Sequence, residues 1–190
     1  MLQTAIEMMQ GGITPSVSDL AEAAEVSRAT AYRYFPSQTA LIHAVVDEAL
    51  GPILDWHSDE EDAGERVADL IRTSMPRILE FEATFRAALR VSLDQWAQSQ
   101  AGTLGAEPRL ERGHRIDLLK AATAPLKERL GSAGTDRLAK ALSLIFGLEL
   151  VIVLKDMWGI DDAEMEDVAV WAARSLVRAS LQPAAAGGAS

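Results

Sequence analysis

Apolar residues recur every three to four positions along nearly the whole chain, and this spacing is the feature that most constrains its fold. Leu2, Ala5, Ile6 and Met9 form the first such stripe. Side chains at this spacing share one face of an α-helix, whereas a half-buried strand would alternate every second residue. No segment alternates convincingly, and no internal repeat is visible. The sequence therefore predicts an all-α protein of about nine helices.

The first fifty residues divide into three short helices and the start of a longer one. Gly11 and the glycine after it end the first helix. Ser16 stands three residues before an aspartate, which is the spacing of a capping box, and Ser27 and Ser37 are favourable N-caps for the next two helices. Only the residues EVS separate the second helix from the third. Such a short gap between short helices is typical of a helix-turn-helix.

Composition narrows the class of protein further. The chain has 190 residues, a net charge of −10 and no cysteine, so disulfides, thiolate metal sites and Cys nucleophiles are excluded. The longest apolar stretch, residues 142–154, contains Glu149 and is shorter than the roughly 20 residues that a membrane span needs. The first residues also lack the basic and apolar regions of a signal peptide. We expect a soluble, cytoplasmic protein with no membrane partner.

One motif within residues 16–45, SVSDLAEAAEVSRATAYRYFPSQTALIHAV, is specific enough to suggest a family. Its elements, in order, are Val26, Ser27, Thr30, Tyr32, Tyr34, Phe35 and Ser37. This segment resembles the DNA-binding region of the tetracycline-repressor (TetR) family of bacterial transcriptional regulators. The resemblance covers the first fifty residues, and the rest is similar only in its helix layout. It implies a dimeric regulator of transcription, most often a repressor. We also expect no enzymatic activity and no cofactor.

The resemblance assigns DNA contacts to three neighbouring segments. A recognition helix reads base edges with residues near its N-terminus, and Arg28 and Ala29 suit a guanine and a thymine methyl group there. The other residues are expected to contact phosphates. They offer hydroxyl groups, the N-terminus of a helix and the charge of Arg33. The full set is Ser16, Ser18, Arg28, Ala29, Thr30, Tyr32, Arg33, Tyr34 and Gln38.

The segment departs from the family pattern at two positions and in its charge. Glu25 occupies the turn position that is usually glycine, so the turn has to form without a glycine's conformational freedom. Gln38 occupies a position that is typically a phosphate-binding lysine. Residues 1–50 contain two arginines, no lysine and six acidic residues, whereas a basic surface supplies most DNA affinity. We therefore expect a further basic segment before Met1 in the natural protein.

The remainder of the chain is predicted to bind a ligand and to dimerise. We expect a helix-turn-helix domain over residues 1–50, a helical domain over 51–182 and a disordered tail over 183–190. The helix expected from Leu138 to Leu154 is apolar almost all round, which predicts burial on several sides. The resemblance implies that it pairs with the last helix and their twins in a two-fold dimer on a palindromic operator. The expected interface residues are Leu138, Leu142, Ile145, Met165, Val168, Ala169, Ala172 and Leu176.

An unknown small-molecule inducer is expected in the second domain. Ligand pockets are mostly apolar with a few placed polar groups, and Glu149 lies within an apolar stretch. Two interpretations of Glu149 stay open: an acid that faces solvent or pairs with an arginine, or a polar contact in the inducer cavity. The candidate lining residues are Met75, Phe85, Leu89, Trp96, His114, Phe146 and Glu149.

Other functions have weaker support in the sequence. His57 stands beside an acidic run that more often marks a solvated face than a metal site, and we expect no metal. No grouping of Ser, His and acid indicates a nucleophilic enzyme. The main alternative, motivated by the acidic first fifty residues, is a ligand-binding dimer on the same scaffold with weak or lost DNA binding.

Overall fold

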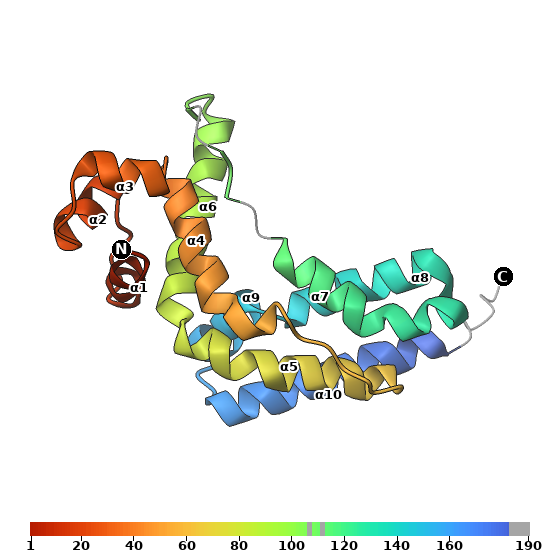
Figure 1. The fold of residues 1–190 in the computed structure, drawn as a ribbon. Coiled ribbons are helices and arrows are strands. Elements are labelled where there is room, and N and C mark those ends of the chain that lie inside the picture. Colours follow the sequence, from red (N-terminus) through yellow and green to blue (C-terminus); the bar gives the residue numbers. More distant parts are fainter. Residues whose placement is uncertain (106–107, 111–112, 183–190) are drawn as a thin grey trace. The chain divides into compact units, whose positions relative to one another are not determined.

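The computed structural model describes residues 1–105, 108–110 and 113–182, and within these residues every regular element is helical. The predicted all-α class is confirmed (Figure 1). The predicted tail at 183–190 lies outside the described residues. No helix in the described part of the chain is long and apolar enough to cross a membrane.

Two compact units make up the chain. The N-terminal unit comprises Met1–Gly51 and Arg77–Arg112, and the C-terminal unit comprises Pro52–Pro76 and Gly113–Ser190. The sequence-based division at residue 50 places residues 77–112 with the second domain, whereas in the structure they pack with the first helices. Amphipathic spacing shows which face of a helix is buried but not which neighbour buries it.

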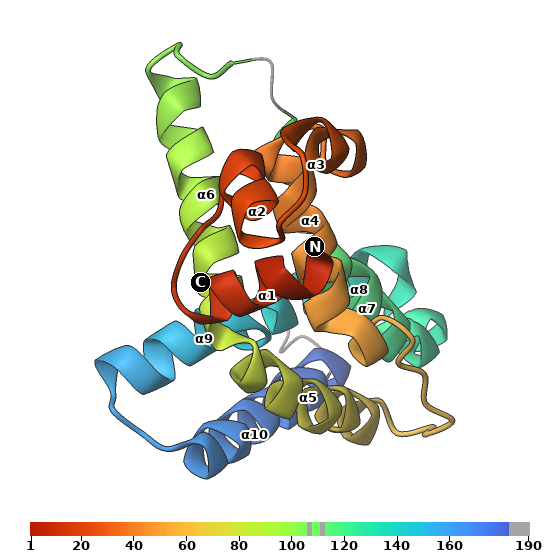
Figure 2. The same cartoon turned by 60° about the vertical axis from the view of Figure 1, so that its left-hand side comes forward.

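The N-terminal unit is built from α1 (Leu2–Gln10), α2 (Val17–Ala23), α3 (Arg28–Tyr34), α4 (Gln38–Leu50) and α6 (Glu82–Gln100). Helices α1, α4 and α6 contact one another, and α2 packs on α3 (Figure 2). Their core joins Ile6, Met9, Leu20, Leu41 and Val45 to apolar residues from the second segment of the unit, including Phe81 and Ala88. Helix α6 thus helps to bury the apolar faces of α1 and α4.

Arg77 fixes the end of α4 within this unit. Its Nε donates to the carbonyl oxygen of Ala49 at 2.8 Å, and its Nη2 donates to that of Glu48 at 3.2 Å. The last carbonyl groups of a helix have no partner within the helix, so this arginine satisfies two of them. The chain then passes through a 3₁₀ turn at Gly51–Ile53.

The C-terminal unit contains most of α5 (Ala63–Glu80), together with α7 (His114–Thr123), a 3₁₀ turn at Ala124–Leu126, α8 (Lys127–Leu142) and α10 (Asp162–Leu181). Helix α8 contacts both α7 and α10. Helices α5 and α10 lie side by side in both views (Figures 1 and 2). Glu65 pairs with Arg174 and Arg72 approaches Glu166, so these two helices run antiparallel.

The long helix predicted from Leu138 to Leu154 is wrong. Helix α8 ends at Leu142 and is followed by a 3₁₀ turn at Ser143–Ile145, by α9 (Leu148–Val151) and by a π-helix at Ile152–Met157. Phe146 is extended and Gly147 has φ 96°, a left-handed conformation that favours glycine. The Arg115 guanidinium lies against this glycine, and a Cβ there would meet its Nη2 at 3.2 Å. The predominantly apolar character of the segment gave no indication of this break.

Candidate functional site

The turn between α2 and α3 closes with two backbone hydrogen bonds. Glu25 N donates to Glu22 O at 3.1 Å, and Val26 N donates to Ala21 O at 2.9 Å. Together they form the Schellman motif, which requires a left-handed residue after the helix. Glu25 occupies that position with φ 54° and is the only non-glycine residue with positive φ in the described ranges. The turn therefore forms without glycine, as the sequence predicted, at the cost of placing a side chain in a disfavoured conformation.

Helix α3 has one inward and one outward face. Ser27 caps it by accepting a 3.1 Å hydrogen bond from Thr30 N, which confirms the predicted N-cap. Ala31 is fully buried, and Phe35 packs against both core clusters of the unit. Tyr32 and Tyr34 are 46% and 60% exposed. The buried residues anchor the helix and leave its other face free.

The outward face of α3 carries the candidate base-reading and phosphate-binding groups. Arg28, Ala29 and Arg33 are exposed, and Thr30 is half-buried. The Arg33 guanidinium lies 5.4 Å from the centre of the Tyr34 ring, a cation–π geometry. This contact holds a positive charge beside an exposed phenol group, an arrangement that suits a phosphate.

Ser16 and Asp19 form the predicted capping box at the start of α2. Ser16 Oγ accepts from Asp19 N at 3.1 Å, and Asp19 Oδ2 accepts from Ser16 N at 2.9 Å. The hydrogen bond with the Ser16 side chain, followed by that with its backbone, lowers the pKa of Asp19 below its ordinary value. Asp19 therefore stays ionised and adds a negative charge close to the surface expected to meet DNA.

The remaining predicted contacts lie beside this helix start. Ser18 is half-buried in the first turn of α2, and Gln38 is half-buried in the first turn of α4. Gln38 Nε2 donates to Pro15 O at 3.1 Å, so part of this side chain holds the approach to α2 in place. All nine predicted DNA contacts thus lie on α2, α3, the cap of α2 or the start of α4, within one unit.

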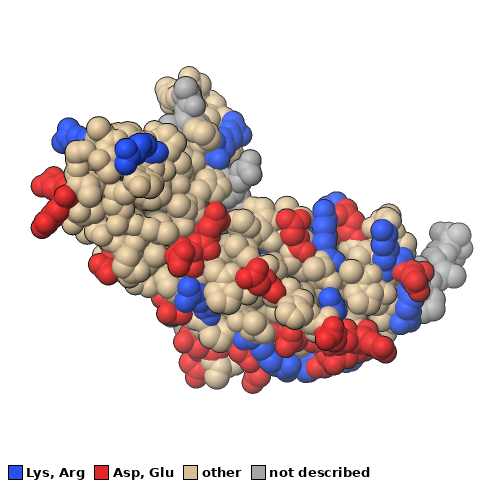
Figure 3. Space-filling model, in the orientation of Figure 1, with Lys and Arg blue, Asp and Glu red and all other residues tan. Residues whose placement is uncertain are grey.

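The charge of this surface is modest. In Figure 3 the surface over α2 and α3 is mostly uncharged, with blue atoms on α3 and red atoms at its outer edge. Arg28 and Arg33 are the only basic residues among positions 1–50. Binding to a polyanion at this surface would draw on these two arginines together with hydroxyl groups and backbone amides.

The structure divides the candidate ligand-binding residues between the two units. Phe85, Leu89 and Trp96 belong to the N-terminal unit, where Phe85 packs on the core and Trp96 is exposed. The other four belong to the C-terminal unit, where Met75 and Phe146 are buried. The residues are thus not brought together within either unit.

Glu149 is paired with an arginine, which was one of its two open interpretations. Arg115 Nη2 donates to Glu149 Oε2, and Arg115 Nη1 donates to Ser143 O at 3.2 Å. The arginine therefore ties α9 to the 3₁₀ turn that precedes it. This bond accounts for an acid within an apolar stretch.

The candidate dimer residues separate into buried and accessible groups. Leu138, Leu142, Met165 and Ala169 are at most 2% exposed, so they are core residues of their own unit and cannot present a surface to a partner. Ile145, Ala172 and Leu176 are half-buried, and Val168 is exposed. Apolar spacing alone does not distinguish the core side of a helix from a side that meets another chain.

A group of exposed apolar residues in the C-terminal unit contains Val168 of the expected interface and four residues that the sequence did not indicate. We call it the apolar surface, and its members are Leu144, Val153, Met157, Trp158 and Val168. Trp158 is 74% exposed, and Trp171, which is 69% exposed, lies about one turn after Val168 on α10. The elements that carry these residues adjoin one another, since α10 contacts both the 3₁₀ turn at 143–145 and the π-helix at 152–157. Exposed apolar residues on adjoining elements commonly mark interaction sites. Tryptophan at the end of an apolar run is the sequence signal that could have indicated them.

Comparisons with known proteins identify the N-terminal region. The family model described as "Bacterial regulatory proteins, tetR family" matches residues 2–45. No curated protein and no solved structure matches the chain. The matched residues are those that form α1, α2, α3 and most of α4.

Proposed function

Because this chain carries the N-terminal helix-turn-helix domain of the tetR family of bacterial regulatory proteins, we propose that it is a ligand-responsive repressor that binds a palindromic operator as a homodimer. The family is one of DNA-binding regulators of transcription, so no enzymatic step is part of the proposal. The observation that carries it is the two-faced helix α3 within the matched segment, where Ala31 is buried while Arg28 and Tyr32 face outward.

The proposed contacts follow from the order of groups along α3. Arg28 and Ala29 stand in its first turn, from which a recognition helix reaches base edges in the major groove. Thr30, Tyr32, Arg33 and Tyr34 offer hydroxyl groups and a charge for phosphates, which position the helix without reading sequence. The start of α2, beside Ser16, supplies the backbone amide of Ser18 to an adjacent phosphate.

Dimerisation is proposed through the apolar surface of the C-terminal unit. Leu144, Met157 and Trp158 are its most exposed members, and Val168 is on the neighbouring helix α10. Aromatic residues and methionine are enriched at the centres of protein interfaces. Pairing of identical surfaces about a two-fold axis would match the two-fold symmetry of a palindrome. The half-buried Ile145, Ala172 and Leu176 would flank this contact.

The ligand response is proposed for the C-terminal unit, which contains Ser74. The hydroxyl of Ser74, beside Met75 on α5, is buried and has no hydrogen-bond partner among the described residues. A buried polar group without a partner suits a ligand contact in an apolar environment. An inducer would lower operator affinity only if it binds the DNA-incompetent arrangement more tightly than the competent one.

Selection of bound sequences from a genomic or random DNA library tests the proposal directly. The full chain is incubated with the library, and the recovered fragments are sequenced after several rounds at two salt concentrations. A repressor enriches a few palindromic sites whose affinity falls as salt rises. Recovery without any enriched sequence would contradict operator binding.

The alternative function is a ligand-binding dimer with weak or lost DNA binding. It is motivated by the excess of acidic over basic residues in positions 1–50. Such a protein would still form a dimer but would enrich no sequence in the selection experiment. The oligomeric state and the DNA selection therefore distinguish the two functions.

A further inference from the structure

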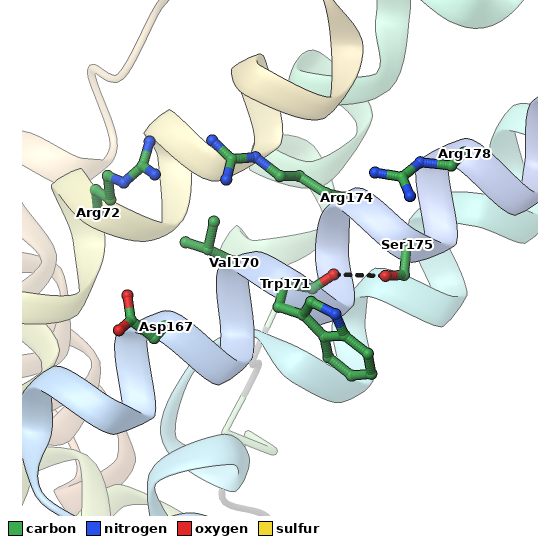
Figure 4. Close-up of a pocket in the computed structure, with 7 residues that line it drawn as sticks. All are labelled: Arg72, Asp167, Val170, Trp171, Arg174, Ser175 and Arg178. Atoms are coloured by element: carbon green, nitrogen blue, oxygen red, sulfur yellow. Dashed lines mark hydrogen bonds between the residues drawn. The ribbon is translucent and has the colours of Figure 1, made fainter.

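A hollow of about 340 Å³ in the C-terminal unit brings three arginines together (Figure 4). One lining residue, Arg72, comes from α5, and the others come from α10. The α10 residues are Asp167, Val170, Trp171, Arg174, Ser175 and Arg178. Their spacing of three and four residues places them along one face of that helix. The hollow therefore runs along α10, on the side that faces α5.

The three guanidinium groups are incompletely neutralised. Arg174 Nη2 donates to Glu65 Oε2 at 2.6 Å, and this bond is the leading cause that raises the pKa of Arg174 above its usual value. Arg72 Nε stands 4.0 Å from Glu166 Oε1, beyond hydrogen-bond distance. Arg178 makes no hydrogen bond or ion pair with any described residue. Three guanidinium groups thus share a single hydrogen bond to a carboxylate.

The arrangement favours a negatively charged guest. Figure 4 shows the three guanidinium groups in a row, with Arg72 and Arg174 extending toward one another from facing helices. Like charges at close range repel one another, and an anion between them removes that penalty. In addition, Arg174 Nε is buried and has no partner among the described residues. The hollow therefore has more hydrogen-bond donors than its own acceptors satisfy.

The other lining groups indicate which further chemical features a ligand of this hollow would have. Val170 and the exposed indole of Trp171 supply an apolar wall, and Ser175 Oγ already donates to Trp171 O at 2.8 Å. Asp167 stands at one end and would repel an anion. Guanidinium groups bind carboxylates and phosphates through paired N–H···O bonds. A small molecule with an oxyanion at one end and an apolar body at the other fits these groups.

We propose that this hollow binds small molecules that carry a carboxylate or phosphate group. Arg72 and Arg178 contact the oxyanion, Arg174 adds its charge while it remains paired with Glu65, and the apolar part of the molecule lies on Val170 and Trp171. The site does not depend on the proposed DNA binding, because every group that forms it belongs to the C-terminal unit.

Isothermal titration of the full chain with benzoate and, separately, with inorganic phosphate tests the proposal. Both titrations are run at constant ionic strength against a chloride control, and light scattering checks that each variant keeps its oligomeric state. We expect saturable binding of at least one of the two anions. Arg178→Gln and Arg72→Gln should each weaken it roughly tenfold or more, the effect of losing one charged hydrogen bond.

Three further variants sharpen the test. Arg137→Gln removes an exposed arginine of α8 that does not line the hollow, and it should leave the affinity unchanged. Asp167→Asn should strengthen binding of either anion, and Trp171→Leu should weaken benzoate more than phosphate. Binding of benzoate alone would indicate a carboxylate guest, and binding of phosphate alone a phosphorylated one.

Three results would overturn the site. They are absence of saturable binding for both anions, an affinity unaffected by both Arg178→Gln and Arg72→Gln, and an equal loss in Arg137→Gln. Thermal unfolding of each variant separates a lost contact from a lost fold, and Arg178 and Arg72 are suited to this because neither holds a hydrogen bond that the unit needs.

Discussion

Gln95 of α6 donates a 3.0 Å hydrogen bond to Thr39 Oγ1 in the first turn of α4, and both residues are buried. The same amide group donates to Pro108 O at 3.2 Å and accepts from Leu110 N at 2.8 Å. One buried side chain therefore joins α6, the segment that follows it and α4, the helix that comes directly after α3. The N-terminal unit depends on residues far outside the segment that the family model matches.

Replacing Gln95 by leucine should lower the free energy of unfolding of this unit by about 1–3 kcal/mol, because the buried amide of Leu110 loses its acceptor. Urea unfolding followed by circular dichroism measures the change. Gln98→Leu, at an exposed position on the same helix, should change stability by no more than about 0.5 kcal/mol. Similar effects of the two substitutions would show that the buried bonds contribute little.

Glu25→Gly should raise the free energy of unfolding by on the order of 1 kcal/mol, since glycine adopts the left-handed conformation without the strain of a side chain. Thermal unfolding measures this gain. Glu22→Gly, within the last turn of α2, should instead lower stability by about 1 kcal/mol because glycine weakens a helix interior. Glu25→Gln removes the charge but keeps the strain, so it should lack most of the gain. A loss of stability in Glu25→Gly would mean that Glu25 makes an unrecognised favourable contact.

Arg28→Ala should cost about 1–3 kcal/mol of operator affinity at one base position if this residue reads a guanine, and it should relax the preference there. Tyr32→Phe should weaken binding about equally for all sequences, because phosphates carry no sequence information. Fluorescence anisotropy with the selected operator and its single-base variants compares the two. An unchanged sequence preference in Arg28→Ala would exclude a base-reading role.

Trp158→Glu should weaken the proposed dimer at least tenfold, because truncating a central interface tryptophan commonly costs about 2 kcal/mol or more. Size-exclusion chromatography with light scattering over a concentration series gives the dissociation constant. Trp96→Glu is the matched control, since Trp96 is similarly exposed but lies on α6 of the N-terminal unit. Equal dimer stability in both variants would place the interface elsewhere.

The first fifty residues could be predicted closely because their structure is encoded locally. Ser16, Ser27 and Ser37 each cap a helix through an N–H three residues ahead, and a cap depends only on near neighbours. The turn at Glu25 also follows from short-range hydrogen bonds. Its left-handed backbone could be expected from the position in the motif even though the residue is unfavourable there.

Features that depend on distant contacts could not be predicted in this way. Helix α6 packs on α1 and α4, and Trp158 is exposed. Both features depend on which apolar faces pack against one another, and periodicity does not specify this. The expected interface residues Met165 and Ala169 are instead core. The arginine hollow could not be predicted either, because Arg72 lies about a hundred positions before Arg178 in the sequence.

Gly147 has an evolutionary consequence. Its left-handed backbone and the Arg115 guanidinium against it disfavour a side chain for two independent reasons. Mutational drift should therefore spare this position in close homologues, even in those whose ligands have diverged. An invariant glycine there would reflect the backbone conformation that leads into α9. It would not be evidence that the homologues bind the same inducer.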